Sequence, residues 1–130
     1  MKLNPDCVRD VLLELEKQEY DTRIHINDLT KNLTQYSAED VKYSCLKLFE
    51  GGYIYGKSTL VGNKHIPLVD DIFDITYKGH EFLNTIRPVS RWNKLKSIGI
   101  TAGSFSLKLI NDVGTKLALS EITEFIKNID

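Results

Sequence analysis

The chain has 130 residues, of which 42% are hydrophobic and 27% charged, and its formal net charge is -1 at pH 7. This length predicts one domain with a small appendage, and no apolar run reaches the length of a membrane span. The near-neutral charge disfavours nucleic acid as a partner on average, because neutralisation of phosphates supplies much of the affinity for a duplex.

The beginning of the chain and the two cysteines indicate where in the cell the protein is located and which chemistry it is expected to lack. Asp6, Arg9 and Glu14 interrupt the basic-then-apolar pattern of a signal peptide, so we expect a soluble cytoplasmic protein. Cys7 and Cys45 lie on or beside the apolar stripes of predicted helices. We interpret both as core residues rather than as metal ligands or nucleophiles.

The first predicted helix runs from Pro5 to about Glu19. Asn4 is its expected cap, and proline suits the first helical position because the missing N–H would have no partner there. Four apolar residues fall on one face of this helix: Val8, Val11, Leu12 and Leu15.

A polar break at 20–22 separates this helix from a brief edge strand at 23–26, where apolar and polar residues alternate. Asn27 or Asp28 is expected to cap a second short helix that carries Leu29 and Leu33. Together with the next helix, this segment is the helix-turn-helix candidate.

The segment 37–54 predicts a helix, its stop and the start of a strand. Ser37 is the expected cap and Asp40 reaches back to it, as in a capping box. Gly52 supplies the left-handed residue that ends a helix. Val41, Cys45 and Leu48 are predicted to face the core, whereas Glu39, Lys42, Tyr43 and Lys47 lie around the other side.

The pattern from 53 to 76 predicts two strands joined as a wing. The expected turn lies at 61–64 and the returning strand at 72–75, while Pro67 leaves the register open. Thr76 then caps a helix with Phe82, Leu83 and Ile86 facing inward. Gly79, near the start of that helix, is expected to permit a close approach to the sheet.

Pro88 marks the expected boundary between a domain at 1–87 and a helical extension at 88–130. The extension is predicted to contain a short helix around Trp92, a flexible break at 99–103 and a helix at 105–119. The aligned residues of that last helix are Leu109, Val113 and Leu117.

Ser120 is the expected cap of a final segment with a regular apolar stripe, formed by Ile122, Phe125, Ile126 and Ile129. Such a stripe needs a partner surface. The spacing leaves two alternatives open, folding back on the first domain or pairing with a second copy as a homodimer.

These elements predict a mainly α fold with a small β-wing (α+β), a winged helix-turn-helix followed by C-terminal helices. Three stretches, MKLNPDCVRDVLLELE, LFEGGYI and ITYKGHEFLNTIR followed by a Trp and a Ser-Leu-rich helix, resemble a family of small, uncharacterised bacteriophage and prophage proteins. The likeness spans nearly the whole chain. It implies a phage or bacterial origin, and hence a bacterial host cell, and a winged-helix N-terminal part. It supplies no ligand, reaction or binding residues.

No catalytic signature is present, so we expect no enzymatic activity and no cofactor. His25, His65 and His80 are far apart and lack the spacing of metal ligands, and we therefore predict no metal site. Nucleophile elbows, P-loops and dinucleotide glycine fingerprints are also missing.

For double-stranded DNA, Lys42, Tyr43 and Lys47 on the second helix of the motif are the predicted groove contacts. Lys57, Lys64 and His65 in the wing are the predicted backbone contacts. The hypothesis is a small transcriptional regulator that dimerises through 105–129.

The alternative is a winged-helix module that binds a host or phage protein, which the near-neutral charge favours. Positive residues gathered on one face would favour DNA, and scattered positive residues would favour protein. The candidates for such a face include the basic stretch from Arg87 to Lys96.

Overall fold

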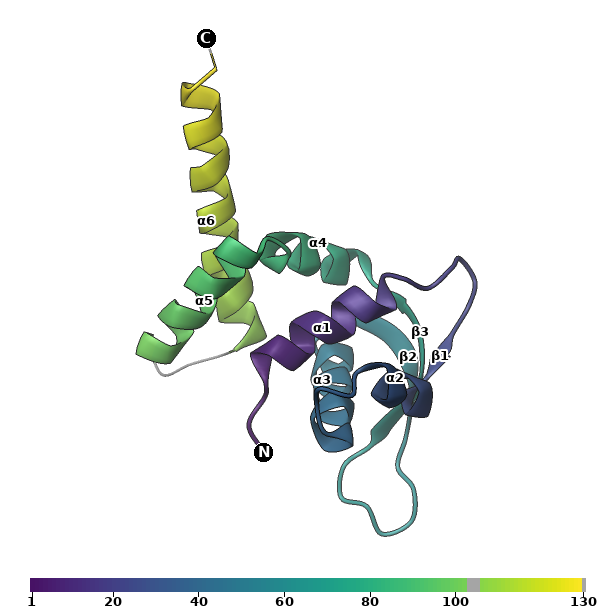
Figure 1. The fold of residues 1–130 in the computed structure, drawn as a ribbon. Helices are drawn as coiled ribbons and strands as arrows, with labels where there is room; N and C mark the ends of the chain where they lie inside the picture. Colours follow the sequence, from purple (N-terminus) through teal and green to yellow (C-terminus); the bar gives the residue numbers. More distant parts are fainter. Residues whose placement is uncertain (103–105, 130) are drawn as a thin grey trace. The chain divides into compact units, whose positions relative to one another are not determined.

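The computed structural model describes residues 1–102 and 106–129, which form an α+β protein with six helices and a small three-stranded antiparallel sheet. In chain order the elements are α1 (Pro5–Leu15), β1 (Ile24–His25), α2 (Ile26–Asn32), α3 (Ala38–Glu50), β2 (Ile54–Thr59), β3 (Leu68–Ile75), α4 (Tyr77–Ile86), α5 (Val89–Ala102) and α6 (Leu107–Lys127) (Figure 1). Two compact units, Met1–Glu81 and Phe82–Asp130, divide the chain within α4.

The first three helices begin at polar caps. Asn4 accepts a hydrogen bond from the Cys7 amide at 3.3 Å and Ser37 accepts one from the Asp40 amide at 3.1 Å, as predicted. The prediction for α2 was wrong, because the Nδ1 atom of His25 accepts from the Asn27 amide at 3.1 Å. The helix therefore begins directly after β1, and its cap lies two residues before Asn27, the earlier of the two expected caps. α1 is shorter than predicted and ends at Leu15.

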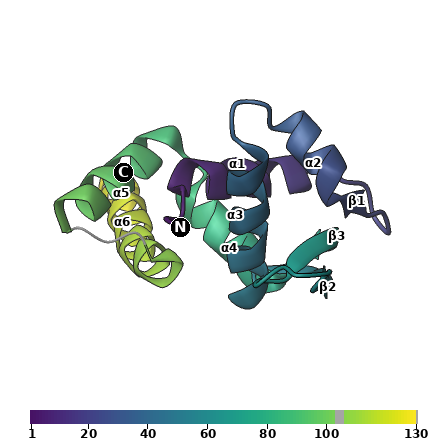
Figure 2. The ribbon, with the colours of Figure 1, turned by 90° about the horizontal axis from the view of Figure 1, so that it is seen from below.

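The sheet has the strand order β1-β3-β2, so that β3 lies in the middle. β3 pairs with β2 from Ile54↔Ile75 to Thr59↔Leu68, with two irregularities between Tyr55 and Ser58. The sequence had left this register open. Ile54 and Ile75 are buried on one face of the sheet, while Tyr55 and Phe73 are exposed on the other. Figures 1 and 2 show α1, α2 and α3 gathered against the buried face.

The core of Met1–Glu81 forms where α1 and α3 pack on the sheet. Both cysteines are fully buried there, which confirms their predicted core role. Burial raises the pKa of Cys7 to about 11, an effect that the neighbouring Ser44 hydroxyl partly offsets. Burial also raises the pKa of Cys45. Thiols of this kind are unreactive, because the thiolate is the nucleophile.

We expect neither Cys7 nor Cys45 to react with Ellman's reagent at neutral pH until the domain unfolds. Both thiols are inaccessible and protonated in the folded state. The measurement compares the absorbance change of the native chain with that of the chain in guanidinium chloride. A rapid native reaction of one thiol would show that the packing of α1 on α3 opens readily.

The turn after α3 is tied to the start of α4. Gly52 is left-handed, with φ of 78°, as predicted. Its carbonyl oxygen accepts from the Thr76 hydroxyl at 2.6 Å, and the same hydroxyl accepts from the Gly79 amide at 3.0 Å, which confirms Thr76 as a cap. The Thr76 amide donates to the carbonyl oxygen of Tyr53 at 3.0 Å. A Cβ atom on Gly79 would lie closer than 3.0 Å to that same oxygen. The predicted close approach is confirmed.

The helices of Phe82–Asp130 differ from the prediction in two ways. α5 continues through Gly99 to Ala102, so the expected break is wrong over 99–102; a single glycine costs only about 1 kcal/mol in a helix and Gly99 is buried. Gly103 and Phe105 lie outside the described residues. α6 runs without interruption through Ser120, which is therefore not a cap; Ser106 accepts from the Leu109 amide instead.

The face of α6 that is buried also differs. Ile110 and Gly114 are buried, whereas Leu109 is exposed and Val113 and Leu117 are half-buried. A Cβ atom on Gly114 would lie closer than 3.0 Å to the Thr85 side chain. Gly114 therefore determines which face of α6 is packed, and a search for apolar side chains at helical spacing does not detect a glycine.

Arg91 on α5 joins α6 to the end of α4. Its guanidinium donates to the Glu121 carboxylate at 2.6 Å and to the carbonyl oxygen of Thr85 at 2.9 Å. This ion pair lowers the pKa of Glu121. From Leu119 to Ile129 every residue is exposed. Five large apolar side chains in this range are between 54% and 68% exposed: Leu119, Ile122, Phe125, Ile126 and Ile129. Within the described ranges, no helix is both long and apolar enough to cross a membrane.

Candidate interaction surface on α3 and the β2–β3 loop

The predicted groove contacts on α3 are Lys42, Tyr43 and Lys47, and all three are half-buried. The Lys47 ammonium lies 3.0 and 3.1 Å from the two carboxylate oxygens of Glu50 and 5.2 Å from the centroid of the Tyr43 ring. The hydrogen bond to Glu50 raises the pKa of Lys47. Its charge is therefore already partly neutralised within the helix.

The predicted backbone contacts Lys57, Lys64 and His65 are all exposed, but they lie in different settings. Lys57 is opposite Asp71 in the β2–β3 register. The neighbouring Asp70 accepts from the Thr59 hydroxyl at 2.8 Å, and this hydrogen bond, with a smaller contribution from Lys57, lowers the pKa of Asp70. The carboxylates of Asp70 and Asp71 therefore lie near Lys57. Lys64 and His65 belong to the loop between the strands.

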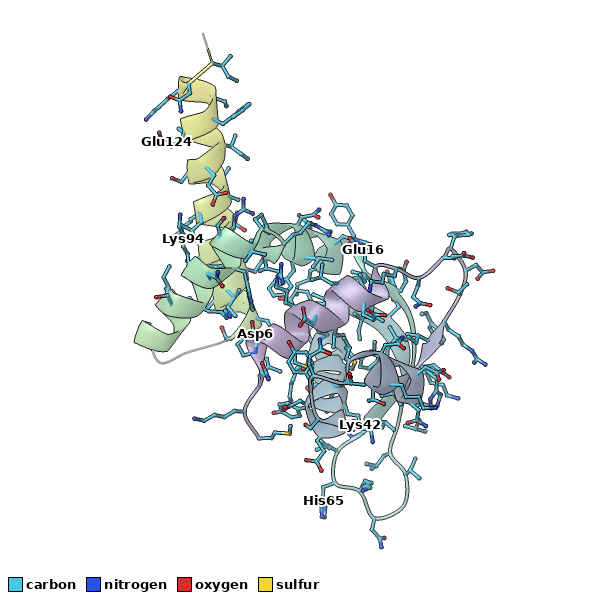
Figure 3. The ribbon with its side chains drawn as sticks, in the orientation of Figure 1. Asp6, Glu16, Lys42, His65, Lys94 and Glu124 are labelled. Atoms are coloured by element: carbon cyan, nitrogen blue, oxygen red, sulfur yellow. The ribbon has the colours of Figure 1, made fainter. Side chains whose placement is uncertain are left out.

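The N-terminal half of α3 and the β2–β3 loop enclose an open groove of about 380 Å³. Its apolar lining comes from Met1, Leu46, Val61, Ile66, Pro67 and Leu68, and its polar lining from Glu39, Lys42, Tyr43, Thr59 and Lys64. Figure 3 shows Lys42 on α3 and His65 in the loop at the same end of this unit. The fold thus brings Lys42, Tyr43 and Lys64 to one surface, and Lys47 and Lys57 do not line it.

Lys42 and Lys64 both line the groove. Within 1–102 and 106–129, neither makes an ion pair, and the same holds for Lys57, whereas Lys47 is paired with Glu50. The two lysines of the groove lie on two elements far apart in sequence. Their charges are therefore available to an anionic partner.

The two units carry opposite net charge. Met1–Glu81 contains ten Lys and Arg residues against fourteen Asp and Glu, a formal charge of -4. Phe82–Asp130 contains seven against four, a formal charge of +3. The unit that holds α3 is thus the acidic one, and the basic stretch after Arg87 belongs to the other.

A second hollow of about 690 Å³ lies between the loop at 18–23 and the residues Phe73 and Asp74. Most of the residues that line it are polar and belong to that loop, and the side chain of Tyr20 among them is 99% exposed. In the described part of the chain, no three His, Cys, Asp or Glu side chains gather where they could hold a metal ion. The α3 groove is therefore the better candidate site.

Sequence reasoning missed the apolar part of this groove. Leu46 had no assigned place on α3, yet it is buried and lines the groove. Val61 and Ile66, on either side of the loop's turn, are 62% and 57% exposed. Two apolar pairs around a polar turn, Leu60-Val61 and Ile66-Pro67, were the available signal, because a wing that binds only phosphates needs no such residues.

Comparison with known proteins places the chain among relatives without an assigned activity. Residues 2–105 match the family model described as "Hypothetical protein (DUF2513)". An uncharacterized protein of Haemophilus influenzae is 30% identical over 126 residues, which cover 97% of this chain and 99% of the relative. No solved structure matches the chain.

Proposed function

Because the chain belongs to the DUF2513 family, whose description assigns no activity, we propose a function from the arrangement of its own residues. Met1–Glu81 is a winged helix-turn-helix unit, and the protein is a small DNA-binding transcriptional regulator of phage or prophage type. Two features support the fold proposal. The elements follow the order α1-β1-α2-α3-β2-β3 with the sheet order β1-β3-β2, and a short turn joins α2 to α3.

The proposed DNA contact uses the surface shared by α3 and the β2–β3 loop. α3 enters the major groove with Lys42 and Tyr43, and the loop brings Lys64 and His65 to the phosphates. Lys47 and Lys57 contribute less, since carboxylates accompany both. The observation that carries the proposal is that Lys42 and Lys64, which make no ion pair within 1–102 and 106–129, line one groove of the unit.

We further propose that the chain dimerises through the exposed apolar stripe of α6. Leu119, Ile122 and Ile126 on α6, and Ile129 just beyond its C-cap, are spaced by three, four and three residues, which is the spacing of a coiled-coil seam. A dimer doubles the phosphate contacts of one weak module and reads two half-sites. A relative from a bacterium supports a bacterial or prophage setting.

The test is a titration of fluorescent duplex DNA with the full chain over a range of salt concentrations. Replacing Lys42 and Lys64 by Ala is expected to weaken binding and to reduce the slope of log K against log salt by about 2, one for each phosphate that the variant no longer neutralises. Lys47→Ala is expected to change the slope less, because Glu50 already neutralises part of its charge.

The matched control is Lys31→Ala, because Lys31 is an exposed lysine of the same unit outside the proposed contact surface and, within the described residues, makes no ion pair; it is expected to leave the slope nearly unchanged. An equal slope for the Lys42 and Lys64 variant and the wild type would refute the proposed DNA contact.

A second candidate function is a protein-interaction module that contacts a host or phage protein through the same surface. The formal charge of -4 on Met1–Glu81 and the apolar lining of the groove favour it. Binding to DNA at low salt favours the regulator. If the folded chain does not bind DNA at low salt, the result favours the protein-binding module.

A further inference from the structure

The groove between α3 and the β2–β3 loop has the composition of a ligand site rather than of a surface that meets only phosphates. Val61, Ile66 and Leu68 present apolar side chains from the loop and the start of β3, and Leu46 lies on the opposite wall. Its volume of about 380 Å³ falls within the range of small-molecule sites, which are mostly apolar with a few convergent polar groups.

The charged groups of the groove select the class of ligand. Lys42 and Lys64 supply two positive charges that, in the described ranges, no ion pair occupies, and Glu39 supplies one negative charge. Positive charge therefore exceeds negative charge beside an apolar wall. This excess complements an anionic group attached to an apolar body.

We propose that this groove binds a small organic monoanion, with its apolar body against Leu46, Val61 and Ile66 and its carboxylate or sulfonate between Lys42 and Lys64. The regulatory consequence rests on the proposed function. A ligand held there would neutralise the two lysines that we assign to DNA and would block the approach of α3 to the groove of the duplex. It would therefore release the operator.

The probe is anilinonaphthalene sulfonate, an aromatic monoanion whose fluorescence rises in apolar sites. Its neutral counterpart, N-phenylnaphthylamine, has the same rings without the sulfonate. The full chain is expected to bind the sulfonate saturably, with one site per chain. Replacing Lys42 and Lys64 by Gln should raise its dissociation constant about tenfold, since each exposed ion pair contributes a few-fold. Binding of the neutral probe should stay the same.

Two further variants locate the site. Val61→Ser with Ile66→Ser, at exposed positions where folding is not at risk, should weaken both probes. Phe125→Ser, on the separate apolar stripe of α6, should affect neither. An unchanged sulfonate affinity in the Lys42 and Lys64 variant, or loss of binding in Phe125→Ser, would overturn the proposal.

Competition against duplex DNA separates this inference from the proposed function. If the sulfonate binds as expected and the chain does not bind DNA, the ligand site stands and the regulator proposal fails. If the chain binds DNA and the sulfonate shows no saturable binding, the ligand site alone fails. Release of bound DNA by the sulfonate, but not by the neutral probe, is the result expected from both proposals together.

Discussion

Gly79→Ala is expected to lower the free energy of unfolding of Met1–Glu81 by about 3 kcal/mol, the upper end of the cost of overpacking. The added Cβ would lie closer than 3.0 Å to the Tyr53 carbonyl oxygen and to the Ile75 side chain. The backbone cannot move away cheaply, because that oxygen also accepts from the Thr76 amide at 3.0 Å. A reduction of this size is a large part of the stability of a small domain.

The measurement is urea unfolding followed by far-UV circular dichroism. Gly62→Ala is the matched control, because Gly62 has a φ of 60° but open space around its Cβ position. Its expected cost is only the backbone strain of a left-handed residue, about 1 kcal/mol. Equal destabilisation in the two variants would show that α4 does not approach the turn after α3 closely.

Replacing Ile122 and Ile126 by Ser is expected to raise the dissociation constant of the dimer by more than about 100-fold. Each isoleucine contributes roughly 1.5 to 3 kcal/mol when buried, and a symmetric dimer loses each of them twice. Light scattering after gel filtration should give about twice the chain mass of 14.9 kDa for the wild type and a single chain mass for the variant.

The control for the α6 stripe replaces Glu124 and Lys127 by Ser. These residues lie on the same turns of α6 and off the stripe, where they form an exposed ion pair at 3.7 Å. Such a pair contributes little to stability, so the control variant should remain a dimer. A wild-type chain that stays monomeric at high micromolar concentration would contradict the proposed dimer.

The elements that were predicted well depend on local chemistry. Asn4, Ser37 and Thr76 cap their helices because a short polar side chain can reach an amide two or three residues ahead in any fold. Gly52 and Gly79 were identified because only glycine tolerates the conformation of the first and the close approach of the second. Caps and glycines of this kind can be predicted from a few neighbouring residues in the sequence.

The two wrongly predicted caps have different causes, one in the neighbouring residues and one far away in the chain. Ser120 resembles a cap, but the helix-forming residues on both sides of it carry α6 through. His25 caps α2 because β1 pairs with β3 and ends there, a constraint set by residues more than forty positions later. The apolar pairs of the β2–β3 loop are visible in the sequence, but the groove itself is not, because it requires that loop to return to the side of α3.

The opposite charges of the two units have a practical consequence for how the protein will behave on a column. At neutral pH, residues 1–81 carry a net negative charge and residues 82–130 a net positive charge. The positive charge of residues 82–130 is then expected to favour retention of the intact chain on heparin whether or not α3 binds DNA. Affinity for a polyanion therefore does not show whether α3 contacts DNA. Replacement of Lys42 and Lys64, beside the α3 groove, is the test of that contact.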